Sequence, residues 1–191
     1  MHKKTILSIA LFSFLTSLNV YSNGLITYKP PKLDALNTSH VGGGTRALGV
    51  PKILVLAPKE VALTSTPQPI LYWYKSTLTA QEFKIVVMES GQTVPLLEKE
   101  VLVSENGLQK ISLQDDNVNL QPNKIYEWSV STRNHSENAG ASISYQAVPF
   151  LQTIEQKAES GYWYDVLSQL IESNSPLKHE LLEQIGIKVD F

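Results

Sequence analysis

Short apolar or alternating runs, separated by turn residues, dominate the chain from residue 52 to residue 148. Seven of them predict β-strands, at Ile53–Ala57, Ile70–Tyr74, Phe83–Met88, Leu97–Val103, Leu108–Leu113, Lys124–Ser131 and Ser142–Gln146. Six or seven short strands at regular spacing are typical of an antiparallel β-sandwich. We therefore expect a mostly β fold, with an antiparallel immunoglobulin- or fibronectin-like sandwich over residues 51–148. Asn106-Gly107 is the clearest hairpin signal, because both residues tolerate positive φ.

One predicted strand carries a more specific signal. Leu120 and Pro122 precede Tyr126, which opens an alternating segment with Trp128 and Val130. This arrangement resembles the tyrosine corner of fibronectin-type sandwiches. Because alternate side chains of a strand share a face, we expect these three to fill the core.

The period of the pattern changes after Val148. Apolar residues from Leu151 to Ile171 recur at helical spacing, with Gly161 as a predicted break or tight contact. Ser175-Pro176 is a typical helix start and Gly186 a typical stop. Residues 149–191 are therefore expected to form a helical pair packed on the sandwich. Both faces of Ile70–Tyr74 are apolar or aromatic, so we expect the pair to cover that strand, with Tyr162, Trp163 or Tyr164 near Tyr72 and Tyr74.

The N-terminal region is typical of an exported protein. A basic start with Lys3 and Lys4 precedes an apolar run too short to span a membrane, and Val20-Tyr21-Ser22 fits a signal-peptidase site. We expect residues 1–22 to be a signal peptide and residues 23–50 an extended leader with a glycine-rich junction. The mature chain is expected not to span a membrane.

Composition narrows the possible partners and chemistries. The chain of 191 residues has no cysteine, which excludes disulfides and thiolate metal sites. Its net charge is −2, and cleavage after Ser22 would leave 14 basic against 18 acidic residues. Nucleic acid is therefore not an expected partner, since binding it needs a basic surplus.

Four motifs in series support a resemblance to a known family. They are Gly42-Gly43-Gly44-Thr45-Arg46, Tyr72-Trp73-Tyr74, Leu120-x-Pro122 with Tyr126-x-Trp128, and Gly161-x-Trp163-Tyr164-Asp165-x-Leu167. Over about residues 42–186, they resemble domain of unknown function 928, found in exported proteins of cyanobacteria and other Gram-negative bacteria. The resemblance implies export from a bacterial cell and brings no activity, cofactor or catalytic residue with it.

The candidate binding residues are Arg46, Tyr162, Trp163, Tyr164 and Asp165. The three aromatic residues could offer a platform for a peptide or glycan, with Asp165 as the polar anchor. The alternative is structural, with Trp163 filling an interface and Asp165 fixing the helix to a loop. Arg46 and the triple glycine could hold an anion or form a flexible junction that docks on the sandwich.

Other polar groups give weaker signals. Asp115-Asp116-Asn117 with Asn119 could form a calcium loop, but such clusters are usually turns. Glu98 and Glu100 share one face of a predicted strand, as on a solvated surface. Ser175-x-x-Lys178 matches a serine–lysine spacing, yet Ser175 is better explained as a helix cap. No catalytic residue, metal site or cofactor is therefore predicted.

The expected function is an exported, non-catalytic binding or accessory module for an envelope protein or a cell-wall component. One alternative is an envelope hydrolase or transferase whose site, for example Asp165 with His135 or His179, forms only in the fold. Another is a structural subunit of a secretion or envelope complex. The ligand and the oligomeric state stay open.

Overall fold

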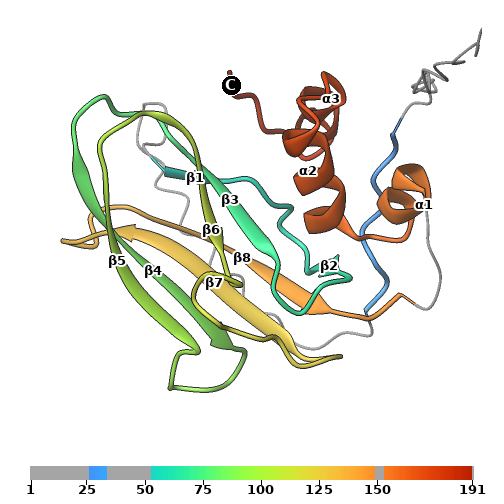
Figure 1. Ribbon diagram of the computed structural model, residues 1–191, viewed down its shortest axis with the longest axis horizontal. Coiled ribbons are helices and arrows are strands. Elements are labelled where there is room, and N and C mark those ends of the chain that lie inside the picture. The colour runs from blue at the N-terminus through green and yellow to red at the C-terminus, as the bar shows by residue number, and fades with distance from the viewer. Residues whose placement is uncertain (1–25, 34–52, 149–152, 191) are drawn as a thin grey trace, which may run out of the picture.

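A computed structural model describes residues 26–33, 53–148 and 153–190, and shows two facing β-sheets with three short helices beside them (Figure 1). The strands are β1 (Ile53–Val55), β2 (Ala62–Thr64), β3 (Ile70–Lys75), β4 (Gln81–Glu89), β5 (Leu97–Val103), β6 (Gly107–Ser112), β7 (Ile125–Thr132) and β8 (Asn138–Tyr145). The mostly β class is as the sequence predicts. All seven predicted strands are present, with ends shifted by up to four residues.

The two sheets have three and five strands. The smaller has the order β1-β3-β6 and is antiparallel throughout. The larger has the order β2-β8-β7-β4-β5, and β2 runs parallel to β8. The prediction of a purely antiparallel sandwich is therefore wrong at this edge. The sequence analysis also missed β2, because Ala62–Thr64 is too short to show a period.

The core lies between the sheets and follows the predicted alternation. Tyr126, Trp128 and Val130 of β7 are buried, opposite Trp73 of β3. Trp73 meets the ring of Phe83 edge to face, with centroids 4.9 Å apart. The interior of the sandwich is thus formed by buried residues that alternate along the central strands.

The tyrosine corner is confirmed. The Tyr126 hydroxyl accepts a hydrogen bond of 2.9 Å from the backbone N–H of Gln121, five residues upstream. The predicted hairpin at Asn106-Gly107 is wrong, because β5 and β6 belong to different sheets. Gly107 does adopt a positive φ of 97°, so the turn chemistry is present while the connection crosses from one sheet to the other.

The C-terminal region forms three helices where the sequence predicts two. They are α1 (Ile154–Glu159), α2 (Trp163–Glu172) and α3 (Leu177–Glu183). Gly161 separates the first two, with a φ of 87° that side-chain-bearing residues rarely adopt. The N-cap of α3 is Pro176 and not Ser175, so the predicted helix start is one residue early; the Ser175 hydroxyl still accepts a 3.3 Å bond from the N–H of Leu177.

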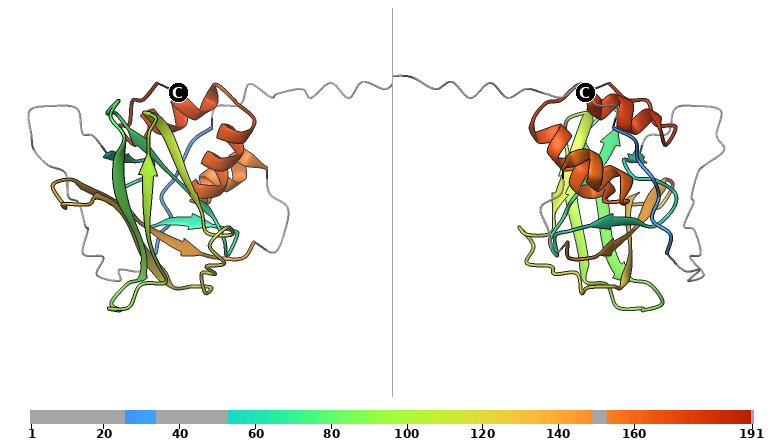
Figure 2. Two further views of the ribbon diagram at one scale, coloured as in Figure 1. Left: turned by 60° about the vertical axis from the view of Figure 1, so that its left-hand side comes forward. Right: turned by 90° about the vertical axis from the view of Figure 1, so that its right-hand side faces the viewer.

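The helices lie together along one side of the strands (Figures 1 and 2). Helix α2 packs on β2 and on the outer face of β3, where Ser168 and Glu172 lie near Tyr72. Burial, with a smaller contribution from Glu172, raises the pKa of Tyr72, and the Ser168 hydroxyl opposes this shift. The expectation that helices cover the strand Ile70–Tyr74 is thus met, and it explains why both faces of that strand are apolar.

A short N-terminal segment, residues 26–33, runs between the helices (blue in Figures 1 and 2). We call it the arm. Ile26 and Tyr28 are buried, so this part of the predicted extended leader contributes to the core.

Candidate functional site

Trp163 opens α2 and is fully buried. Its indole Nε1–H donates a 2.9 Å hydrogen bond to the backbone oxygen of Leu56, and its ring meets Tyr28 of the arm edge to face at 4.9 Å. The indole is therefore satisfied at its polar tip and covered on its apolar body. A ligand cannot reach it in this arrangement.

Tyr164 crosses from the helices into the core of the larger sheet. Its hydroxyl accepts a 2.9 Å bond from Trp128 Nε1 and donates at 3.3 Å to the backbone oxygen of Ser142. Burial raises the pKa of Tyr164 well above its usual value, and the bond from Trp128 only partly offsets this. The side chain therefore stays neutral, and it satisfies a buried indole that would otherwise lack an acceptor.

Asp165 fastens α2 to the end of β2. Its Oδ1 accepts from the Thr64 hydroxyl at 3.0 Å, and both carboxylate oxygens accept from the Ser65 N–H at 3.0 and 3.1 Å. The Ser65 hydroxyl also donates to Oδ2, and Lys157 Nζ lies 3.8 Å away. The carboxylate lies in the first turn of α2, where the helix dipole favours negative charge.

We refer to Trp163, Tyr164 and Asp165 with these partners as the joint. Tyr162 adjoins it at the N-cap of α2, and burial, with Asp165 nearby, raises its pKa. The structure brings these four predicted residues together, and contacts inside the chain occupy the side chains of Trp163, Tyr164 and Asp165. Arg46 and the triple glycine lie outside the described residues.

An open cleft lies beside α3, the last helix of the C-terminal region. A cleft of about 750 Å³ separates β1 and β3 from α3 and the segment after it. Its lining residues are Leu54, Tyr74, Ser76, His179, Leu182, Glu183, Gly186, Ile187, Lys188, Val189 and Asp190. We call it the C-terminal cleft. Its volume falls in the range of small-molecule and peptide-fragment sites.

The cleft combines an apolar floor with charges of both signs. His179, Leu182 and Glu183 are three and four residues apart, so they share the face of α3 that lines it. Glu183 lies 3.8 Å from Lys188, and both side chains are largely exposed. Because exposed ion pairs add little to stability, these charges are available to a ligand at small cost to the fold.

The sequence analysis missed this cleft as a site. The sequence predicts only that Tyr74 packs against a helix and that the second helix runs up to a stop at Gly186. One signal was present, since Lys188 and Asp190 alternate with apolar Ile187 and Val189 beyond the predicted stop at Gly186. Such alternation predicts an extended segment with two unlike faces.

A second, smaller hollow lies on the outer face of the larger sheet. It has a volume of about 390 Å³ and is lined by Lys59, Glu60, Val86, Met88, Glu127, Trp128, Ser129, Gly140, Ala141 and Ser142. Gly140 pairs with Ser129 in the β7–β8 register, and these small residues make a depression in the surface of the sheet. The hollow is a shallower candidate than the C-terminal cleft.

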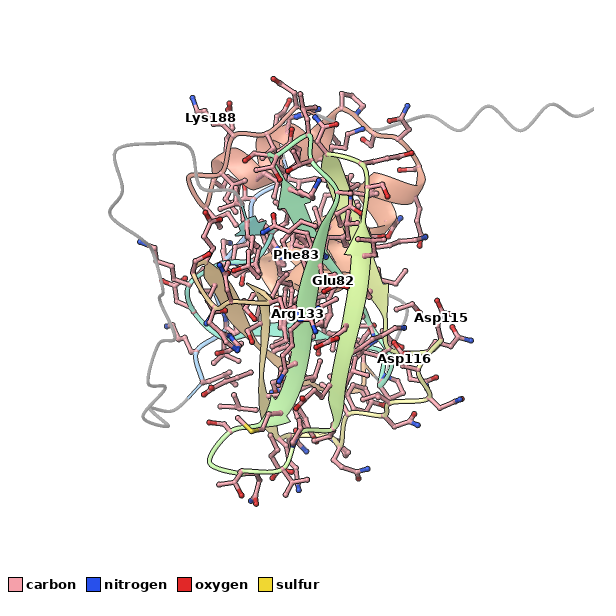
Figure 3. The ribbon with its side chains drawn as sticks, turned by 90° about the vertical axis from the view of Figure 1, so that its left-hand side faces the viewer. Glu82, Phe83, Asp115, Asp116, Arg133 and Lys188 are labelled. Carbon is pink, nitrogen blue, oxygen red and sulfur yellow. The ribbon has the colours of Figure 1, made fainter. Side chains whose placement is uncertain are left out.

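The acidic and histidine candidates of the sequence analysis lie in different parts of the molecule. Asp116 forms an ion pair with Lys99 at 2.7 Å, and Figure 3 shows Asp116 beside Asp115 at one edge of the molecule. His135 is in the β7–β8 turn beside Arg133, which pairs with Glu82 at 2.6 Å (Figure 3). His179 lines the cleft and Asp165 the joint. Within the described ranges, no group of three His, Asp or Glu residues could hold a metal ion.

The comparison with protein families agrees with the motifs in the sequence. A profile described as Domain of Unknown Function (DUF928) matches residues 41–188, about three quarters of the chain. The chain belongs to the DUF928 family. A search of curated proteins finds no match for this DUF928 chain. In the ranges that the structure describes, none of its helices has the length and apolar character needed to cross a membrane.

Proposed function

We propose that this DUF928 protein is a non-catalytic binding module of the bacterial envelope and that its ligand occupies the C-terminal cleft. The observation that carries the proposal is that the joint is filled by contacts within the chain, whereas the C-terminal cleft is open. The joint's polar groups are bonded within the chain, whereas the cleft is open, large enough for a ligand, and lined by both apolar and charged groups.

The lining favours a peptide-like ligand with charges of both signs. Glu183 and Asp190 can receive an amino group, Lys188 can receive a carboxylate, and the floor with Leu54 and Tyr74 can hold an apolar or aliphatic part. Short segments of a protein partner and the stem peptides of the cell wall both have this chemistry. A nucleic acid does not, because its charges are of one sign.

The proposed role agrees with a fibronectin-like interpretation of the sandwich. The order β1-β3-β6 opposite β8-β7-β4-β5, with a tyrosine corner at the start of β7, is similar to the arrangement of such sandwiches. Strand β2 is then an added edge strand beside β8. Sandwiches of this type often serve as recognition scaffolds, which is an argument by analogy.

Export is part of the same proposal and rests on the basic and apolar start of the sequence. Sequencing the N-terminus of the protein recovered from the periplasm or medium tests it, with Asn23 as the expected first residue. An N-terminus at Met1 in the cytosolic fraction would contradict export and leave the cleft unaffected.

The alternative of a hydrolase or transferase gains no support from the predicted residues. Both carboxylate oxygens of Asp165 already accept hydrogen bonds from Ser65, and neither His135 nor His179 is among its partners in the described structure. The alternative of a structural subunit gains little, because the exposed large apolar residues of the described structure are divided among the β3–β4 loop (Leu78), the segment before β5 (Val94, Leu96) and β5 itself (Leu102). Single exposed apolar side chains are ordinary.

Titration of the mature protein with zwitterionic tripeptides and soluble cell-wall stem peptides, followed by two-dimensional NMR, tests the proposal. We expect the shifted amides to lie along Leu54, Tyr74 and Leu182, and Glu183→Lys to weaken binding at least tenfold. Leu78→Ala is the matched control, since this residue is 79% exposed and lies outside the cleft. Shifts confined to Val86 and Met88, or equal affinity of Glu183→Lys, would refute the cleft as the site.

A further inference from the structure

The arm lies in a seat made by the three helices, and it is held there by backbone recognition. The side-chain amide of Gln184 contacts two arm residues: Oε1 accepts from the Tyr28 N–H at 2.8 Å, and Nε2 donates to the Ile26 oxygen at 2.7 Å. The N–H of Lys29 donates at 3.1 Å to the oxygen of Ala158. Hydrogen bonds to the backbone of an extended segment are also the contacts by which proteins bind peptide ligands.

Side-chain contacts give this seat its specificity. The ring of Tyr28 stands edge to face against Trp163, and Ile26 is buried beside it. Gly161 admits Pro31, because a Cβ built on this glycine would lie 2.7 Å from the proline Cδ. The seat therefore selects an extended segment with Ile, Tyr and Pro at the spacing of Ile26, Tyr28 and Pro31.

The hold on the arm is incomplete. The Tyr28 hydroxyl is buried without a hydrogen-bond partner among the residues that the structure describes. Burying an unsatisfied hydroxyl opposes the gain from burying the ring. The ion pair of Lys29 with Glu159, at 3.3 Å, has both side chains more than half exposed and adds little. An arm that leaves its seat loses the Gln184 bonds and the burial of Ile26 and Tyr28, and the arm of a second copy restores the same contacts.

The connection between arm and sandwich is long. Nineteen residues, 34–52, separate Leu33 from β1. At roughly 3.3 Å per residue, a chain of this length can span at most about 60 Å, which is enough to connect one copy to the next.

We propose that the arm exchanges between copies, so that residues 26–33 of one chain occupy the helical seat of another. The occupant is then a second copy of this chain, since its arm carries the side chains that the seat already fits. Exchange of an identical element needs no new interface and is a low-cost route to a dimer. The proposal does not rest on a ligand in the C-terminal cleft.

Single-cysteine variants of the full mature chain test the exchange, because the natural sequence has no cysteine to interfere. Lys29→Cys places a thiol on the arm and Glu159→Cys one beside the seat, at positions that the ion pair shows to be adjacent. A short thiol–thiol cross-linker joins the two single variants above the level of random collision only if the arm of one chain occupies the seat of the other. The double variant, cross-linked within one chain, confirms the geometry of the seat.

We expect the mixed single variants to give a covalent heterodimer whose yield rises at least fivefold from about 10 μM to about 1 mM protein. A synthetic peptide with the sequence of residues 24–33 should lower that yield, and Gln184→Ala should raise the peptide concentration needed. Lys29→Cys mixed with Thr93→Cys is the control for random collision, since residue 93 is exposed in the β4–β5 turn.

Three results would overturn the proposal. One is a double variant that cross-links within the chain while the mixed single variants give no heterodimer at about 1 mM. The second is a yield equal to that of the Thr93→Cys control. The third is a double variant that does not cross-link at all, because the arm would then not occupy the seat. None of these results bears on ligand binding in the cleft.

Discussion

The joint and the C-terminal cleft are made by neighbouring helices, yet the two regions treat their polar groups in opposite ways. At the joint, the indole of Trp163, the hydroxyl of Tyr164 and the carboxylate of Asp165 each bond to a group from the sandwich. At the cleft, apolar residues line an open volume, and the charged groups stand at its exposed rim. Aromatic density in the sequence thus marks the place where two layers are sealed, whereas access for a ligand lies where α3 diverges from β3.

Trp163→Ala should have the largest effect on stability. Replacing a fully buried tryptophan with alanine removes about 3–5 kcal/mol from the free energy of unfolding, and here it also strands the Leu56 oxygen. Urea unfolding measured by circular dichroism checks this. A loss below about 1 kcal/mol would show that the joint is not a sealed contact.

Gly161→Ala should come next, with Gly186→Ala as its matched control. Both glycines have positive φ, 87° and 78°, but only Gly161 faces a close neighbour, Pro31. We expect a loss of about 1 kcal/mol for Gly186→Ala from backbone strain alone, and a further 1–3 kcal/mol, roughly, for Gly161→Ala from overpacking. Equal losses in urea unfolding would mean that the arm does not press on the helical turn.

Tyr164→Phe should cost about 1–3 kcal/mol, because it leaves the buried Trp128 N–H without its acceptor. The ring volume is nearly unchanged, so the effect isolates the hydroxyl. Urea unfolding at neutral pH provides the measurement. Stability within error of the wild type would indicate that another acceptor or a water replaces the hydroxyl.

Alkaline pH should loosen the joint by a smaller, graded amount. Burial raises the pKa of Tyr164 and of Tyr28 in the folded state, with Glu60 adding to the shift at Tyr28. Above the ordinary tyrosine pKa of about 10, the unfolded chain loses these protons while the folded chain keeps them, so stability falls as pH rises. Unfolding at pH 9, 10 and 11 measures the slope, which should be shallower in Tyr164→Phe. An equal slope would place the pH effect elsewhere.

The sandwich was predictable because its signals are local. Alternation along Ile125–Thr132 and the spacing from Leu120 to Tyr126 already specify which side chains enter the core and where the corner forms. The parallel pairing of β2 was not predictable, since three residues carry no period and their partner, β8, lies about 80 residues further along the chain. The path from β5 to β6 also depends on long-range pairing, which overrides the turn preference of Asn106-Gly107.

The site was less predictable than the fold for a related reason. The sequence shows that the indole N–H of Trp163 needs a hydrogen-bond acceptor when it is buried. It does not show that this acceptor is the backbone oxygen of Leu56, 107 residues away in sequence. The distinction between a platform and a seal depends on such remote partners. The cleft arises from the divergence of α3 and β3, and no single segment encodes a space between two elements.

The smallest expected effect is that of Glu183→Gln, which tests the cleft side of the comparison. This change removes a charge that lies 3.8 Å from Lys188 in an exposed ion pair, so the free energy of unfolding should change by less than about 0.5 kcal/mol. Lys84→Gln is a suitable control, because its pair with Glu98 also lies on the surface, at 2.7 Å, and is far from the cleft lining. If the rim charges of the cleft serve a ligand, the two variants should be alike in urea unfolding and differ only in peptide binding. A loss above about 1 kcal/mol for Glu183→Gln alone would instead make the rim a second structural contact, and the contrast between joint and cleft would fail.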